Sequence, residues 1–145
     1  MALVHLIYSS EAATPLSEEQ LGDLMKSVRA KNAAAGVSGI LLLIERSFFQ
    51  LLEGDPTVVD PLFEKIKGDA RHGHVIKLIR EPIEQREFED WSMGLARVQS
   101  KELAALPGFN DFLTAGTGLL DLGSGRARTL LHAFRDGQWR ARVSG

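Results

Sequence analysis

Residues 37–54 read Val-Ser-Gly-Ile-Leu-Leu-Leu-Ile-Glu-Arg-Ser-Phe-Phe-Gln-Leu-Leu-Glu-Gly, and this stretch decides the fold. Two apolar segments, residues 37–44 and residues 47–52, are separated only by the charged pair Glu45-Arg46. Such a pattern is typical of two buried strands joined by a tight hairpin turn. The hairpin therefore supplies two adjacent strands around which the other elements must be arranged.

Further strands are predicted on both sides of the hairpin. The apolar residues 3–8 predict a first strand that ends at Ser9-Ser10. Residues 75–79 and 91–98 predict a fourth and a fifth strand. The charged stretch at residues 81–90 separates these two, and we interpret its acidic side chains as a solvated loop.

Two helices are predicted, one before the hairpin and one after it. Ser17 and Gln20 have the spacing of a capping box, and Gly36 is placed to end the first helix. The second helix follows a turn at residues 54–57 and leads to a polar loop at residues 68–73. Their apolar faces are assigned to Leu21, Leu24, Met25, Val28 and Ala35 in the first helix, and to Val58, Leu62, Phe63, Ile66 and, beyond it, Ile76 in the second.

The order β-α-β-β-α-β, followed by one more strand, predicts an α+β fold of the ferredoxin-like type. In this plan a mixed sheet carries both helices on one face. We assign residues 1–98 to this domain and residues 99–145 to a helical C-terminal extension. The apolar Leu130, Leu131 and Phe134 of the extension are expected to pack on the free face of the sheet or on a partner subunit.

Composition and missing motifs exclude several functions. The 145 residues include no cysteine, which excludes disulfides, iron–sulfur clusters, thiolate zinc sites and a cysteine nucleophile. With 17 Lys+Arg against 19 Asp+Glu, the net charge of -2 gives no reason to expect nucleic-acid binding. The longest apolar run, residues 40–44, is too short to cross a membrane and no secretory signal is seen, so a cytoplasmic location is expected. Because a P-loop, a dinucleotide-binding glycine motif and a nucleophile elbow are missing, we expect neither an enzyme nor a metal site.

Polar side chains on otherwise apolar strands are the candidates for a binding site. Tyr8, the only tyrosine, ends the first strand, and Gln50 lies inside the third. A buried amide needs hydrogen-bond partners, and Gln50 would find them in a neighbouring backbone or in Tyr8. With Asn32 and Arg29 of the first helix, these residues would suit a slot for a flat heteroaromatic ligand, with Arg29 or Arg71 meeting a phosphate outside it. The alternative is that Asn32 belongs to a fraying helix end and Arg29 is solvated.

Six motifs in order resemble those of the BLUF family, the blue-light sensors that use FAD. They are LIYSS at residues 6–10, KN at 31–32 with GVSGIL at 36–41, FFQLLEG at 48–54, DARH at 69–72, EPI at 81–83 and DWSM at 90–93. They extend over residues 3–98 without an evident insertion, and Lys31 departs from the His or Asn of other members. The resemblance implies an FAD cofactor and a stand-alone photoreceptor without enzymatic output.

The resemblance also implies a role for each matching residue. Tyr8 corresponds to the tyrosine that gives an electron and a proton to the excited flavin, and Gln50 to the glutamine between that tyrosine and the flavin ring. Asn32 corresponds to the asparagine that hydrogen-bonds the isoalloxazine ring. Trp91 and Met93 correspond to the pair on the fifth strand that responds to the glutamine. The residues that match family members' contacts to the pyrimidine side of the ring and to the ribityl-phosphate chain are Arg29, Asp69, Arg71 and His72.

The implied mechanism is a hydrogen-bond switch with no net chemistry. Light leaves the Gln50 amide rotated or tautomerised, and the strand bearing Trp91 and Met93 passes this change to the extension at residues 99–145. The expected partner is a downstream signalling protein, and a homo-oligomer is a further expectation.

Two alternatives on the same fold stay open. An acylphosphatase-like enzyme would need an arginine in a glycine-rich loop after the first strand, where Ser9-Ser10-Glu11 supplies none. A cofactor-free regulatory module of the ACT type would use Tyr8 and Gln50 only to satisfy each other. Bound flavin separates both alternatives from the photoreceptor.

Overall fold

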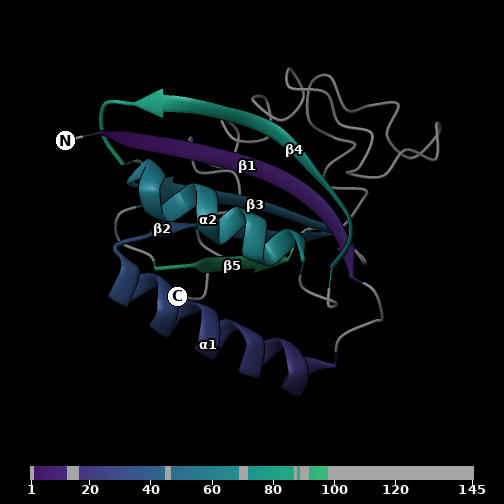
Figure 1. Ribbon diagram of the computed structural model, residues 1–145. Coiled ribbons are helices and arrows are strands. Elements are labelled where there is room, and N and C mark those ends of the chain that lie inside the picture. The colour runs from purple at the N-terminus through teal and green to yellow at the C-terminus, as the bar shows by residue number, and fades with distance from the viewer. Residues whose placement is uncertain are drawn as a thin grey trace.

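The computed structural model describes residues 2–12, 17–44, 47–68, 72–86, 88 and 92–97. These residues form β1 (Leu3–Ala12), α1 (Glu18–Ala35), β2 (Ser38–Ile44), β3 (Ser47–Gly54), α2 (Pro56–Lys67), β4 (His72–Ile83) and β5 (Gly94–Arg97) (Figure 1). The predicted order of elements is therefore confirmed. The Glu45-Arg46 turn and the extension at residues 99–145 lie outside the described residues.

The strands form one mixed sheet in the order β4-β1-β3-β2-β5. β1 is antiparallel to both β3 and β4, and β2 is antiparallel to β3. β5 runs parallel to β2 and adds the fifth strand to the ferredoxin-like plan. β3 is consequently the middle strand, with its side chains shielded on both faces.

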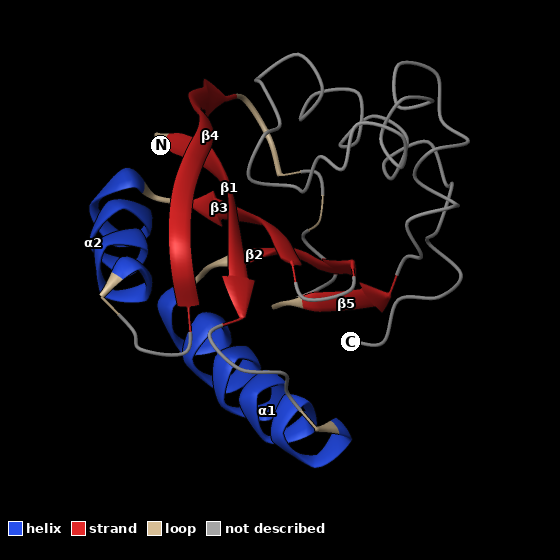
Figure 2. Cartoon of the chain, turned by 90° about the vertical axis from the view of Figure 1, so that its right-hand side faces the viewer, coloured by secondary structure: helices blue, strands red, loops and turns tan. Residues whose placement is uncertain are grey.

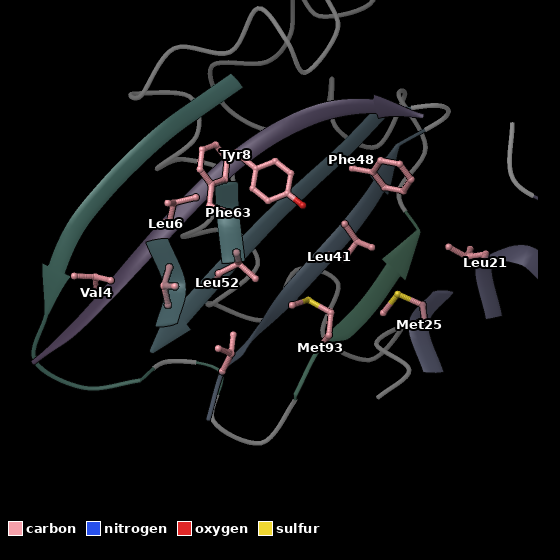
Figure 3. Close-up of a cluster of buried hydrophobic side chains, with 12 residues drawn as sticks. Val4, Leu6, Tyr8, Leu21, Met25, Leu41, Phe48, Leu52, Phe63 and Met93 are labelled. Atoms are coloured by element: carbon pink, nitrogen blue, oxygen red, sulfur yellow. The ribbon is translucent and has the colours of Figure 1, made fainter. Parts of the chain in front are cut away.

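Both helices cover the same face of the sheet, as predicted (Figure 2). One buried cluster contains Leu21 and Met25 of α1, Phe63 of α2, and Leu6 and Leu52 of the sheet (Figure 3). Side chains alternate along a strand, so the strand residues of this cluster face the helices. The residues next to them in the chain point to the opposite face of the sheet. The space between the two helices is therefore floored by β1, β3 and β2.

Local signals fix where the helices begin and end. The Ser17 hydroxyl accepts from the Gln20 N–H at 3.1 Å, and the Gln20 side chain accepts from the Ser17 N–H at 2.9 Å. Gly36 ends α1 in the left-handed region, with φ 72°, where a side chain would be strained. Asp55 begins α2 by accepting from the Thr57 N–H at 2.8 Å. None of the helices that the structure describes has the length and apolarity to cross a membrane.

Three strands are longer than predicted, and one of them, β3, ends at Gly54 instead of residue 52. β1 continues through Ser9 and Ser10 to Ala12, and β4 runs from His72 to Ile83 instead of over residues 75–79. These two strands pair with each other from Leu3↔Ile83 to Ala12↔His72, with two register shifts. Ser9 pairs with β4 and both serines pair with β3, so their backbone groups belong to the sheet and their polar side chains do not end the strand.

The apolar face assigned to α2 omitted Val59 and is wrong at Ile76. Val59 is buried at 0% exposure, and the predicted Val58 is partly buried and packs against the same core cluster. Ile76 lies on β4 and is 39% exposed. It pairs with Ser9, and this register places it on the face of the sheet opposite to the helices. Its neighbour Lys77 pairs with Tyr8 and extends over the Phe63 ring of α2 instead.

Candidate functional site

A pocket opens between the two helices and the sheet. It encloses about 810 Å³ when the open solvent at its mouth is included. Its walls are mostly apolar, and they place Tyr8, Asn32 and Gln50 around a common space. The apolar lining residues are Leu24, Met25, Val28, Leu41, Phe48, Leu52, Leu62 and Ile66.

Tyr8 and Gln50 meet because the sheet places them opposite each other. They are directly paired in the antiparallel ladder between β1 and β3, so their side chains lie next to each other on one face. The Tyr8 hydroxyl donates a hydrogen bond to the Gln50 carbonyl oxygen Oε1. The Phe63 ring packs on Tyr8 with the ring centroids 5.5 Å apart. The phenol is therefore held by packing on its ring and by a hydrogen bond at its tip.

The other end of the Gln50 amide contacts Met93. Gln50 Nε2 donates to Met93 Sδ at 3.3 Å. Both side chains are buried, with Gln50 6% and Met93 0% exposed. Figure 3 shows Tyr8 and Met93 facing the same cluster from β1 and from the residue before β5. The amide orientation is thus defined, with oxygen toward the phenol and nitrogen toward the thioether.

Two side chains of α1 bind the backbone beside Met93. Asn32 Nδ2 donates to the Ser92 carbonyl at 2.8 Å, and Arg29 Nε donates to the Met93 carbonyl at 2.9 Å. Asn32 is only 3% exposed, so the alternative of a fraying helix end is wrong. Asn32 also lines the pocket, as predicted for a ligand contact. Arg29 does not line the pocket and donates to the Met93 carbonyl instead.

The remaining predicted site residues lie wholly or partly outside the described residues. Asp69, Arg71 and Trp91 lie outside the described residues. His72 begins β4, and only its backbone is described. Their roles stay predictions from the resemblance. Within the described ranges, no group of His, Asp and Glu is arranged to hold a metal ion.

Sequence reasoning noted Lys31 only as a departure from the family motif, and it missed Lys65. Lys31 of α1 and Lys65 of α2 both line the pocket, and both are exposed, so they stand toward its open side. Lys65 lies between Leu62 and Ile66, two lining residues one helical turn apart, and this spacing was the signal for it. Two lysines at the mouth favour a ligand that carries negative charge.

Sequence reasoning also missed a buried carboxylate behind the sheet. Glu53 is 0% exposed, and its Oε1 accepts from the Ser38 hydroxyl at 2.9 Å and from the Phe88 N–H at 2.7 Å. Arg86 donates to the Ser38 hydroxyl, the Glu53 carbonyl and the Gly36 carbonyl at 2.8, 3.0 and 2.6 Å. Arg86 and Phe88 thus attach part of the charged stretch at 81–90 to the sheet, while the acidic Glu84 is exposed, as its interpretation as a solvated loop expects.

Residues 3–94 match the profile of a family described as sensors of blue light using FAD, the BLUF family. The chain belongs to the BLUF family. Photoactivated adenylate cyclase subunit alpha of Euglena gracilis is 31% identical over 112 residues, which are 77% of this chain and 11% of that protein. Subunit beta of Euglena longa is 32% identical over 113 residues, 77% of this chain and 13% of that protein. The chain thus spans about a tenth of the length of these BLUF relatives.

Solved BLUF structures have a similar fold. The photo-activated state of BlsA superposes with a TM-score of 0.77 at 29% identity, over 92% of this chain and 94% of the other. The dark state of BlrB, a BLUF protein, gives 0.67 at 32% identity, over 91% and 97% of the two chains. The predicted fold, the FAD cofactor and a sensor that is not an enzyme are therefore established for this BLUF domain. The Tyr8–Gln50 contact alone also suits a cofactor-free module, and family membership decides against it.

Proposed function

We propose that this BLUF domain senses blue light through a switch in the hydrogen bonds of Gln50. The observation that supports it most directly is the Gln50 amide, which accepts from Tyr8 and donates to Met93 in the wall of the pocket. The Tyr8 hydroxyl can both donate and accept a hydrogen bond, whereas the Met93 sulfur can only accept one. The Gln50 amide, with distinct donor and acceptor ends, lies between them.

The residues present fit a bound flavin. The apolar walls suit the faces of a fused aromatic ring, while Asn32 and Gln50 offer amide groups to its polar edge. Lys31 and Lys65 at the open side would bind the phosphates by charge. FAD, when bound, absorbs blue light and thereby becomes a strong oxidant.

Tyr8 is a side chain of the pocket lining that can give an electron to an oxidant. Its phenol gives up an electron together with the proton at Oη, and the Gln50 carbonyl that this proton faces is the nearest acceptor. The electron and the proton then both return to Tyr8, so no net chemistry remains. The transient loss of the Tyr8 O–H donor removes the contact that fixes the amide, and Gln50 is then free to rotate or tautomerise.

Met93 would respond to the rearranged amide. A thioether sulfur accepts hydrogen bonds weakly and donates none. A rotated Gln50 turns Oε1 toward Met93 Sδ, two acceptors face each other, and the 3.3 Å contact is lost. Met93, with Trp91, would pass this change to β5 and then to the extension at residues 99–145.

The receiver of the signal is proposed to be another protein. In the photoactivated adenylate cyclases, the region like this chain accompanies a much longer remainder. For this chain we propose a downstream signalling protein in the cytoplasm, contacted through the C-terminal extension. A homo-oligomer is proposed as an additional contact of the same extension.

Tyr8→Phe tests the switch in its first step. As Tyr8 is the only tyrosine, no other phenol can replace it. We expect the variant to bind FAD and stay yellow but to lose the light-induced red shift of the flavin absorption. Phe63→Leu is the matched control, because it disturbs the packing on Tyr8 but leaves the hydroxyl, and it should keep the shift. A normal red shift in Tyr8→Phe would contradict the proposal.

A further inference from the structure

Met93 is held from two sides by different elements. Its sulfur contacts Gln50 of β3, while its carbonyl accepts from Arg29 of α1. The preceding carbonyl, that of Ser92, accepts from Asn32, three residues along the same helix. Residues three apart share a helix face, so α1 binds two consecutive carbonyls with one face.

Arg29 serves the backbone rather than the pocket. It is absent from the pocket lining, which includes its helix neighbours Val28, Lys31 and Asn32. Its side chain is partly buried, and Nε is directed at the Met93 carbonyl at 2.9 Å. A hydrogen bond from a charged donor is stronger than one from a neutral donor. Of the two α1 contacts, the bond from Arg29 is therefore the stronger restraint on residue 93.

We propose that Arg29 is a positioning residue that holds the Met93 backbone against α1 and so keeps Met93 Sδ beside the Gln50 amide. This proposal rests on the proposed function, and it adds α1 to the elements that sense the orientation of the amide. When the amide turns and the sulfur contact is lost, Arg29 and Asn32 are the side chains seen to hold residues 92 and 93. Because coupling is reciprocal, weakening the Arg29 contact changes the environment of Met93 in the dark.

The methionines offer a direct probe of this contact. The chain has only three, Met1, Met25 and Met93, so a methyl-labelled sample gives few resonances. Met93→Leu assigns the resonance of residue 93 by its disappearance. The measurement is made on the FAD-loaded full chain, in the dark and under blue light.

Arg29→Ala is the decisive variant, and Lys26→Ala is its matched control. Lys26 lies one turn earlier on α1, is exposed, and carries the same charge. We expect Arg29→Ala to shift or broaden the Met93 resonance in the dark and to slow recovery after light about fivefold. FAD loading and the red shift should persist, because Tyr8 and Gln50 are unchanged. Lys26→Ala should match the unmodified chain in every measurement.

Arg29→Lys provides a second test if the alanine variant does not fold. It keeps the positive charge but loses the planar Nε donor, so we expect a smaller change of the Met93 resonance in the same direction. An unmoved Met93 resonance with unchanged recovery in the folded Arg29 variants would overturn the proposal. Failure of the proposed function has a different signature, the absence of a red shift in the unmodified chain, and the dark resonance of Met93 tests Arg29 even then.

Discussion

Gln50 and Glu53 are three residues apart on β3, and both are buried polar side chains. An odd separation on a strand places them on opposite faces, so Gln50 faces the pocket and Glu53 faces away from it. Gln50 is neutral, and one of its two contacts is a weak bond to sulfur. Glu53 has a carboxyl group that accepts from Ser38 and Phe88, and its backbone carbonyl accepts from Arg86.

The difference shows how one strand can contain both a movable and a fixed point. A primary amide exchanges its donor and acceptor ends by rotation, and a weak thioether bond opposes this little. A carboxylate accepts only, and a buried one must keep its partners because its desolvation is costly. The segment between β4 and β5 is therefore anchored at Phe88 by Glu53, while Met93 is next to the group proposed to move.

Glu53→Ala should give the largest effect, and it would break the fixed end. The Ser38 hydroxyl and the Phe88 N–H would lose their acceptor, which we expect to lower the free energy of unfolding by about 3 kcal/mol. Chemical denaturation measures this loss. The red shift should keep its amplitude in the folded protein, since Glu53 faces away from the pocket.

Glu53→Gln sharpens the same test. The bonds from Ser38 and Phe88 both end on Oε1, so the glutamine carbonyl oxygen can keep them while an amide nitrogen replaces the other carboxyl oxygen. A smaller loss, of about 1 to 2 kcal/mol, is therefore expected. If both Glu53 variants were as stable as the unmodified chain, the anchor assigned to Glu53 would be wrong.

Met93→Leu addresses the movable end and should cost less. The substitution nearly conserves volume, so the free energy of unfolding should change by less than about 1.5 kcal/mol. The Gln50 amide loses its sulfur acceptor, and we expect its side-chain N–H resonances to shift in the dark and the recovery rate to change. An unchanged amide resonance and rate would show that the sulfur contact has no part in fixing the amide.

Asp60→Asn should give the smallest effect, because this carboxyl is exposed. Its hydrogen bonds from Arg80, at 2.8 and 2.7 Å, lower the pKa of Asp60, and the desolvation of the carboxyl opposes this. A lowered folded pKa means that the stabilisation is present at neutral pH and is lost as the pH falls through that pKa. We expect Asp60→Asn to lower Tm by no more than about 3 °C at neutral pH. Thermal melts at neutral and strongly acidic pH check this, and a Tm difference that persisted in acid would contradict it.

The face that Tyr8 and Gln50 share could be predicted from the sequence. Both lie in apolar runs with strand character, and the resemblance added their roles. The caps at Ser17 and Gly36 were also predicted correctly, because the signal for each cap lies within a few residues of it. Features whose cause is local in the chain are the ones that sequence reasoning identifies.

The contacts of Arg29 and Glu53 could not be predicted in the same way. Arg29 binds a carbonyl 64 residues away, and Glu53 binds an N–H 35 residues away. Every residue has these backbone groups, apart from the N–H that proline lacks, so no side-chain pattern marks the partner. The C-terminal end of β1 was missed for a related reason, since it depends on where β4 pairs with it.

The chain separations within the site carry a consequence for folding. Tyr8 and Gln50 are 42 residues apart, and Gln50 and Met93 are 43 apart. Such distant contacts form only after the loops between them have closed, so the site is absent until β1, β3 and the residue before β5 are assembled. A cofactor that binds only the assembled form shifts the folding equilibrium toward it by mass action. The light-induced colour change is thus a spectroscopic measure of the folded fraction, and the holoprotein should melt at a higher temperature than the apoprotein.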